Sequence, residues 1–164
     1  YVRVQVRFQR GAGAADRTVS RMGYILQCRS CPFRSEEEGL LPEPQLCPSC
    51  GGKLLPIGPL WTGALQDKEL LERIEASIPE FRLGKATQLL QLVRICRDEP
   101  DISYHYDYHV LSKQFRISPP PIGEVIQSIS SQGYAAARAH YSGTAMKTDA
   151  PLEVIREALI AKRG

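Results

Sequence analysis

Four of the five cysteines fall into two Cys-x-x-Cys pairs, and this spacing constrains the fold more than any other feature of the chain. The pairs are Cys28 with Cys31 and Cys47 with Cys50, and fifteen residues separate them. Two intervening residues let a tight turn aim both sulfurs at one ion, so the pattern is typical of a four-thiolate zinc site. We therefore predict Zn²⁺ bound by Cys28, Cys31, Cys47 and Cys50. Disulfides are the alternative.

The predicted metal is structural rather than catalytic. A closed shell of four sulfurs leaves no position open for water, and neither pair encloses a His, Glu or Asp that would act as a general base. A structural zinc contributes on the order of 10 kcal/mol to folding, more than any surface contact. The fifth cysteine, Cys96, is expected to be a buried thiol.

Positive charge is concentrated at the N-terminal end. The 164 residues, enough for one or two small domains, carry a net charge of +3, but residues 1–34 hold seven arginines and one acid. Guanidinium groups suit phosphate oxygens, so this end is a candidate nucleic-acid surface, with a solubilising face as the alternative. No apolar run has transmembrane length, and Cys-x-x-Cys pairs without a secretory signal favour the reducing cytoplasm.

The first part of the chain has the alternation of β-strands. The expected elements are a strand at 1–10, a Gly/Ala loop at 11–16, a strand at 19–27, an exposed loop from Glu36 to Pro44 and a strand at 53–57. Strands on both sides of two cysteine turns outline a zinc ribbon, so we predict a β-rich zinc-binding subdomain over residues 1–65. The chain opens within a strand pattern and without Met, which predicts a fragment of a longer polypeptide.

From Asp67 the hydrophobic period becomes helical. The expected elements are a helix capped by Asp67 that ends before Pro79, helices at 84–98, 106–115 and 122–132, a hairpin over 134–147 that turns at 142–143, and a helix at 151–162. This order predicts a helical, winged-helix-like subdomain over residues 66–164, and an α+β class for the whole chain. His105 and His109 lie four residues apart, but no third ligand accompanies them, so we interpret them as ordinary helix residues.

The helix expected to read a DNA groove lacks the side chains for that task. Residues 122–132 contain no Lys or Arg and one acid, Glu124. Counterion release, the main source of DNA affinity, therefore has nothing to act on there. The hairpin that follows carries Arg138, His140 and Lys147, which suit shape-based contact with folded RNA or structural packing.

Several stretches, taken together and in this order, resemble a known family. They are Tyr1-Val-Arg-Val, Cys28-x-x-Cys31, Cys47-x-x-Cys50-Gly51, Gly58-Pro59-Leu60-Trp61, Pro119-Pro120-Pro121 and Lys147-Thr148-Asp149-Ala150-Pro151. Over nearly its whole length the chain resembles the C-terminal half of the tRNA (guanine-26-N2)-dimethyltransferase family.

The resemblance implies a division of labour. In the family, an N-terminal Rossmann-like domain binds S-adenosylmethionine and methylates the exocyclic amine of guanine-26, while the C-terminal domain helps to hold the tRNA. The catalytic domain is expected before residue 1. Nothing in this chain matches its motifs, so we assign no catalytic or S-adenosylmethionine-binding residue here. The cysteine quartet is the only site that the resemblance transfers.

The expected partners are tRNA and the N-terminal methyltransferase domain of the same polypeptide, with no membrane. The candidate RNA-binding residues are Arg3, Arg7, Arg21, Arg29, Arg34, Arg138 and Lys147. For Arg3 and Arg7, pairing with carboxylates of the catalytic domain is the alternative. Two other functions remain open for the chain: a zinc-ribbon and winged-helix module that binds DNA, and a structural brace for a catalytic domain.

Overall fold

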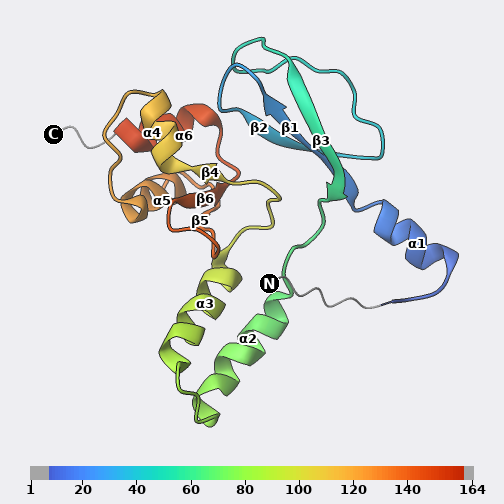
Figure 1. The fold of residues 1–164 in the computed structure, drawn as a ribbon, viewed down its shortest axis with the longest axis vertical. Coiled ribbons are helices and arrows are strands. Elements are labelled where there is room, and N and C mark those ends of the chain that lie inside the picture. The colour runs from blue at the N-terminus through green and yellow to red at the C-terminus, as the bar shows by residue number, and fades with distance from the viewer. Residues whose placement is uncertain (1–7, 161–164) are drawn as a thin grey trace.

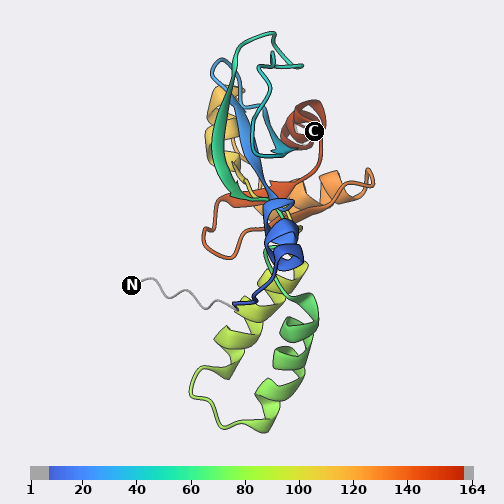
Figure 2. The same ribbon diagram turned by 90° about the vertical axis from the view of Figure 1, so that its right-hand side faces the viewer.

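A computed structural model describes residues 8–160. In that range the chain forms two three-stranded antiparallel sheets and a helical hairpin that projects away from both (Figures 1 and 2). In chain order the elements are α1 (Ala12–Val19), β1 (Met22–Cys28), β2 (Arg34–Glu38), β3 (Leu54–Trp61), α2 (Lys68–Ser77), the 3₁₀ turn η1 (Ile78–Glu80), α3 (Ala86–Asp98), β4 (Tyr106–Asp107), α4 (Tyr108–Gln114), α5 (Ile122–Ser130), β5 (Ala136–Arg138), β6 (Ala145–Thr148) and α6 (Leu152–Ile160). The predicted α+β class is confirmed in that the chain combines helices with small antiparallel sheets.

The first sheet has β1 at its centre, between β2 and β3. Tyr24, Leu26 and Cys28 of β1 are buried at every second position, as expected for a strand that covers a small core, and Gly23 is buried as well. The predicted acidic loop at Glu36 is wrong, because residues 34–38 pair with β1 as β2. An all-polar stretch has no hydrophobic alternation, so only the tertiary pairing turns it into a strand.

The N-terminal predictions need two further corrections. Residues 12–19 form α1 where a loop was predicted, because alanines favour a helix once Gly11 starts it. The second strand begins at Met22, three residues later than predicted. Of the first predicted strand, residues 1–7 lie outside the described part of the chain, and residues 8–10 have no regular structure.

The Gly58-Pro59 pair lies inside β3. At this point the pairing of β1 with β3 shifts register between Gly23 and Ile25, with the extra residue on β3, and the two backbones approach closely. A Cβ on Gly58 would lie 2.7 Å from the carbonyl oxygen of Gly23, and Gly58 has a φ of 157°. Only a residue without a side chain fits this crossing without displacing the backbone.

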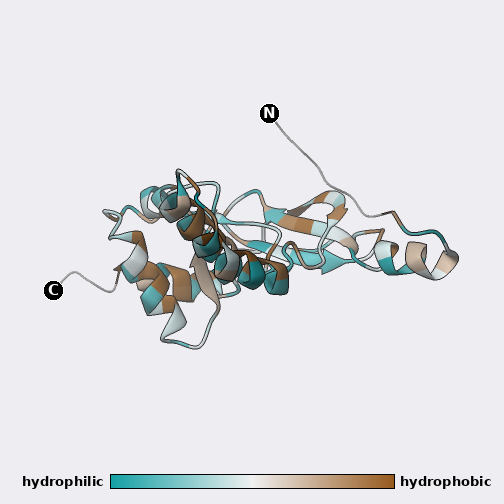
Figure 3. Cartoon of the chain, turned by 90° about the horizontal axis from the view of Figure 1, so that it is seen from below, coloured by the Kyte–Doolittle hydropathy of each residue, from teal (hydrophilic) through white to brown (hydrophobic). Residues whose placement is uncertain are grey.

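Helices α2 and α3 form an antiparallel hairpin joined by η1. As predicted, the Asp67 carboxylate caps α2 by accepting from the Leu70 amide at 2.9 Å, and α2 ends before Pro79. Leu70 is exposed, although a leucine in an amphipathic helix would be expected to point inward. The helices mix hydrophobic and hydrophilic residues (Figure 3), as expected where one side packs and the other faces solvent.

The second sheet, ordered β4-β6-β5, packs with α4, α5 and α6 around the main core. The predicted helix at 106–115 is shortened, because residues 106–107 pair with β6 as β4. The helix near 122, the hairpin turning near 142 and the last helix follow the sequence prediction. The buried core residues are Tyr106, Tyr108, Leu111, Ile122, Val125, Ile129, Met146, Ala150, Ile155, Ala158 and Leu159.

Candidate metal centre and nucleic-acid surface

The structure brings the four predicted cysteines together at one end of the first sheet. Cys28 closes β1, and its backbone N–H donates to the Phe33 carbonyl at 3.0 Å, which closes the first turn. The second turn is closed by the Cys47 N–H, which donates to the Gly52 carbonyl at 2.7 Å. The four sulfurs lie within 4.8 Å of one another, and in the described part of the chain this is the one cluster suited to a metal.

The sulfur positions fit a zinc tetrahedron. Bonds of about 2.3 Å to zinc place neighbouring sulfurs roughly 3.8 Å apart. The Cys28 and Cys50 sulfurs lie 3.5 Å apart, and so do those of Cys31 and Cys47. A disulfide bond would require about 2.05 Å, so the four side chains are separate thiols in this arrangement.

The Cys28 and Cys31 thiols have different pKa values because burial and hydrogen bonds act on them differently. Burial raises the pKa of the Cys28 thiol, but hydrogen bonds from the backbone N–H groups of Ser30 and Cys31, and from neighbouring thiols, outweigh it and lower the pKa to about 7. Burial, reinforced by the other sulfurs, raises the pKa of Cys31 to about 12. Cysteine binds a metal ion as the thiolate, so a cation that binds these four sulfurs displaces the remaining thiol protons.

The exposed arginines of the predicted RNA surface do not form one cluster. Arg21 precedes β1 and Arg29 follows it, so the seven residues of β1 lie between them and place them roughly 26 Å apart. Arg138 lies on β5, in the other sheet. All three side chains face solvent. Arg3 and Arg7 lie outside the described residues.

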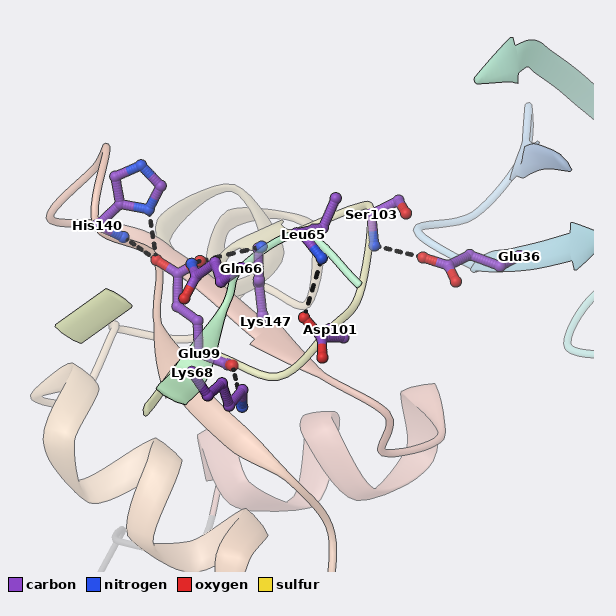
Figure 4. A network of polar contacts seen from close by, with 9 residues as sticks. All are labelled: Glu36, Leu65, Gln66, Lys68, Glu99, Asp101, Ser103, His140 and Lys147. Carbon is purple, nitrogen blue, oxygen red and sulfur yellow. Dashed lines mark hydrogen bonds and ion pairs between the residues drawn. The ribbon is translucent and has the colours of Figure 1, made fainter. Parts of the chain in front are cut away.

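Arg34 has a structural partner. Its guanidinium donates to the His105 carbonyl and lies 5.8 Å from the centre of the Tyr106 ring. Glu36 accepts from the Ser103 backbone N–H in the same region (Figure 4). Both contacts join β2 to the segment before β4. Arg34 therefore helps to hold the two sheets together, and its guanidinium group is less available to bind an RNA phosphate.

Lys147 is placed differently from the expectation for an RNA-binding residue. It lies on β6, is 5 % exposed, and its ammonium group contacts the Glu99 carboxylate at 3.0 Å (Figure 4). The partner, Glu99, is 1 % exposed and follows α3. A buried cation paired within the protein is not available to a phosphate, so this position argues against direct RNA contact by Lys147.

Glu99 is the centre of a polar network that sequence reasoning missed (Figure 4). Its carboxylate accepts from the His140 backbone and ring and from the Gln66 amide, and its backbone carbonyl accepts from Lys68. Burial raises the pKa of Glu99, but the His140 and Lys147 contacts outweigh it, so the pKa lies below its ordinary value of 4.5. Its stabilising contribution is complete above that pH and is lost as the pH falls through the lowered pKa.

Two hollows are lined by arginines from the N-terminal part of the chain. A cleft of about 280 Å³ lies between the first cysteine turn and α4, and its lining includes Arg29, Arg34, His105 and Gln114. A wider hollow of about 910 Å³ lies beside α1, and its lining includes Arg10, Arg17, Arg21 and Trp61. His105 and His109 contact aromatic rings instead of each other; His109 lies in α4 as predicted, but the prediction of a helix residue is wrong for His105, which precedes β4.

The sequence matches the family model of N2,N2-dimethylguanosine tRNA methyltransferases over residues 1–160. The chain belongs to this family. The resemblance drawn from the sequence motifs is thereby confirmed.

Individual relatives support the assignment to the family. The chain is 47 % identical over 157 residues to the tRNA (guanine(26)-N(2))-dimethyltransferase of Methanoculleus marisnigri, covering 96 % of the chain and 42 % of that protein. It is 33 % identical over 165 residues to the enzyme of the same name from Methanosarcina mazei, covering 100 % of the chain and 42 % of that protein. The chain thus spans less than half the length of the curated relatives that it matches.

A solved structure resembles the fold. Trm1 from Pyrococcus horikoshii, solved in complex with S-adenosyl-L-methionine, aligns with a TM-score of 0.74 and 31 % sequence identity. The alignment covers 91 % of this chain and 38 % of that one. Within the described residues, no helix is long and apolar enough to cross a membrane.

Proposed function

We propose that this chain is the zinc-containing, tRNA-holding part of an S-adenosylmethionine-dependent tRNA (guanine-26-N2)-dimethyltransferase. The observation that carries the proposal is the 47 % identity to an enzyme of that name over 96 % of the chain. S-adenosylmethionine binding and methyl transfer belong to the rest of the longer polypeptide. The chain's own task is to hold the RNA while one base is presented for reaction.

In this proposal, Cys28, Cys31, Cys47 and Cys50 hold one structural Zn²⁺. The sulfur distances and the two tight turns support it, as does the antiparallel arrangement of β1 and β3 beside the cysteine turns, which suits a zinc ribbon. The ion would fix both turns and with them the end of the first sheet. Four thiolates and Zn²⁺ carry a net charge of −2, so nearby Arg29 also compensates the site.

We also propose a division into a zinc-binding subdomain, residues 1–65, and a winged-helix-like subdomain, residues 66–164. The order α3, β4, α4, α5, β5, β6, with β6 central in its sheet, is consistent with a winged helix. The end of β3 at Trp61 and the start of α2 at Lys68 support the boundary.

The DNA-binding alternative is disfavoured by α5. Its residues Ile122, Val125 and Ile129 are buried, and the remainder contains one acid, Glu124, and no Lys or Arg. A helix of this composition has no positive charge with which to bind the phosphates that flank a major groove. The brace alternative makes a different prediction, namely that exposed arginines are irrelevant to RNA affinity.

Charge reversal on the exposed arginines tests the proposal against the brace. We expect Arg21→Glu, Arg29→Glu and Arg138→Glu, combined, to weaken tRNA binding about tenfold or more. The slope of the logarithm of the binding constant against the logarithm of the salt concentration should become shallower by about 2 to 3. Each lost phosphate contact removes about one counterion from those released on binding. The measurement is a binding titration of the zinc-loaded chain over a salt series.

The matched control is Arg73→Glu, which reverses another exposed arginine, on the flank of α2. It should leave both affinity and slope near those of the parent chain. Zinc content is measured in every variant, because Arg29 lies beside a metal ligand. Unchanged affinity and slope in a zinc-loaded triple variant would contradict the RNA-holding role of these residues.

A further inference from the structure

The turn between α2 and α3 lies at the end of the hairpin that is farthest from both sheets (Figures 1 and 2). Phe81 follows η1 and is 59 % exposed, and Leu83 beside it is 44 % exposed. With a rise of about 1.5 Å per residue, the ten residues of α2 carry this ring roughly 15 Å beyond the start of the hairpin. A single exposed apolar side chain is common, but Phe81 and Leu83 lie together at the end of a protruding arm, and adjoining exposed apolar residues can form a contact surface.

The tip is ordered by its own backbone and does not owe its exposure to a lack of structure. The Phe81 N–H donates to the Ile78 carbonyl at 3.2 Å, and the Leu83 N–H donates to the Phe81 carbonyl at 2.9 Å. Ile78, immediately below, is 3 % exposed and anchors the turn between the helices. The ring is therefore presented from a fixed base, which lowers the entropy that a partner must overcome on binding.

Charge distinguishes the tip from the flanks of the hairpin. On the flanks, Arg94 and Arg97 both pair with Glu75, at 2.7 and 2.5 Å. At the tip, Arg82 and Lys85 are exposed, and the described residues provide neither with an ion pair or a side-chain hydrogen bond. The tip thus combines an exposed aromatic side chain with two available cations and one exposed acid, Glu80, whereas Arg94 and Arg97 on α3 are neutralised by Glu75.

We propose that the hairpin tip is a second RNA contact, at which Phe81 stacks on an unpaired base while Arg82 and Lys85 meet the adjoining phosphates. Aromatic rings that stack on splayed bases, supported by nearby cations, are the common mode of contact with unpaired RNA. The tip would bind a nucleotide of a loop or junction, and the length of the α2–α3 hairpin would separate this contact from the arginines of the first sheet. This inference rests on the proposed function, because it assumes that the chain binds folded tRNA.

The test uses the zinc-loaded chain and a folded tRNA. Phe81→Ala is expected to weaken binding about 5- to 150-fold, the range that corresponds to losing one base–aromatic stack. Phe81→Trp should keep the affinity. The parent chain has a single Trp, so the added indole is followed by difference, and its fluorescence should be quenched when tRNA is added. Arg82→Gln with Lys85→Gln should make the salt slope shallower by about 1 to 2.

Arg73→Glu, on the flank of the same hairpin, is the matched control and should bind as the parent does. If the parent binds tRNA and Phe81→Ala binds equally well, the tip proposal is wrong while the proposed function stands. If the parent binds no tRNA, the proposed function itself fails. Loss of thermal stability by Phe81→Ala in the longer polypeptide, with tRNA affinity intact, would instead make the tip a protein contact and overturn the proposal.

Discussion

Replacing Cys47 with serine is expected to remove the zinc and unfold the end of the first sheet. Cys47 is 3 % exposed and closes the second turn. Three sulfurs cannot complete the tetrahedron, and the two turns lose the cross-link that holds them together. The contribution at risk is on the order of 10 kcal/mol, more than most small domains have in reserve. The measurements are zinc content per chain and the circular dichroism spectrum, before and after addition of a chelator.

Cys96→Ser is the matched control, because Cys96 is the one cysteine outside the quartet. This variant should retain one zinc per chain and the parent spectrum. The core around α5 and β6 shares no side chain with the quartet, so it should survive in Cys47→Ser. A Cys47→Ser chain that still binds one zinc with the parent's stability would contradict the assigned ligand set.

The second large effect is expected at Lys147. Lys147→Met removes the cation beside a carboxylate that is almost fully buried, and Glu99 then keeps its charge with only hydrogen bonds to balance it. Breaking such a pair costs about 3–5 kcal/mol, because the remaining ion stays desolvated. Denaturant unfolding of the zinc-loaded chain measures this loss.

Two comparisons isolate the pair. The double variant Glu99→Leu with Lys147→Met should recover part of the loss, since neither buried charge remains. Arg94→Ala, which breaks a surface pair with Glu75, should cost about 1 kcal/mol or less. Under conditions where Lys147→Met remains folded, its tRNA affinity should equal that of the parent. A large loss of affinity without loss of stability would restore Lys147 as an RNA contact.

The parts of the fold that local sequence determines were predictable. The cysteine quartet follows from spacing, the cap at Asp67 from an acid before an apolar period, and the hairpin that turns near Gly143 from its flanking strands. Each of these depends on residues close together in the chain. Hydrophobic period and turn chemistry therefore suffice to locate them.

The parts that depend on distant pairings were not predictable. Glu99 and Lys147 lie 48 positions apart, and the residues next to them in sequence do not indicate burial. From the sequence alone, Lys147 is therefore interpreted as an exposed cation of the hairpin. Residues 36–38 form a strand only because β1 offers them an edge. Arg21 and Arg29 are close in sequence but lie at opposite ends of β1. The number of charges in a stretch of sequence therefore does not show whether they form one cluster in the fold.

The central claim is that this chain holds tRNA, and one binding measurement tests it most directly. The zinc-loaded chain is titrated with a folded tRNA and with duplex DNA of similar total charge, each across a salt series. The account predicts clearly tighter binding to tRNA at every salt concentration, because shape and unpaired bases add to the phosphate attraction that both polymers share. Equal weak affinity for the two, or no binding to either, would contradict it and leave the chain as a brace for the rest of the enzyme.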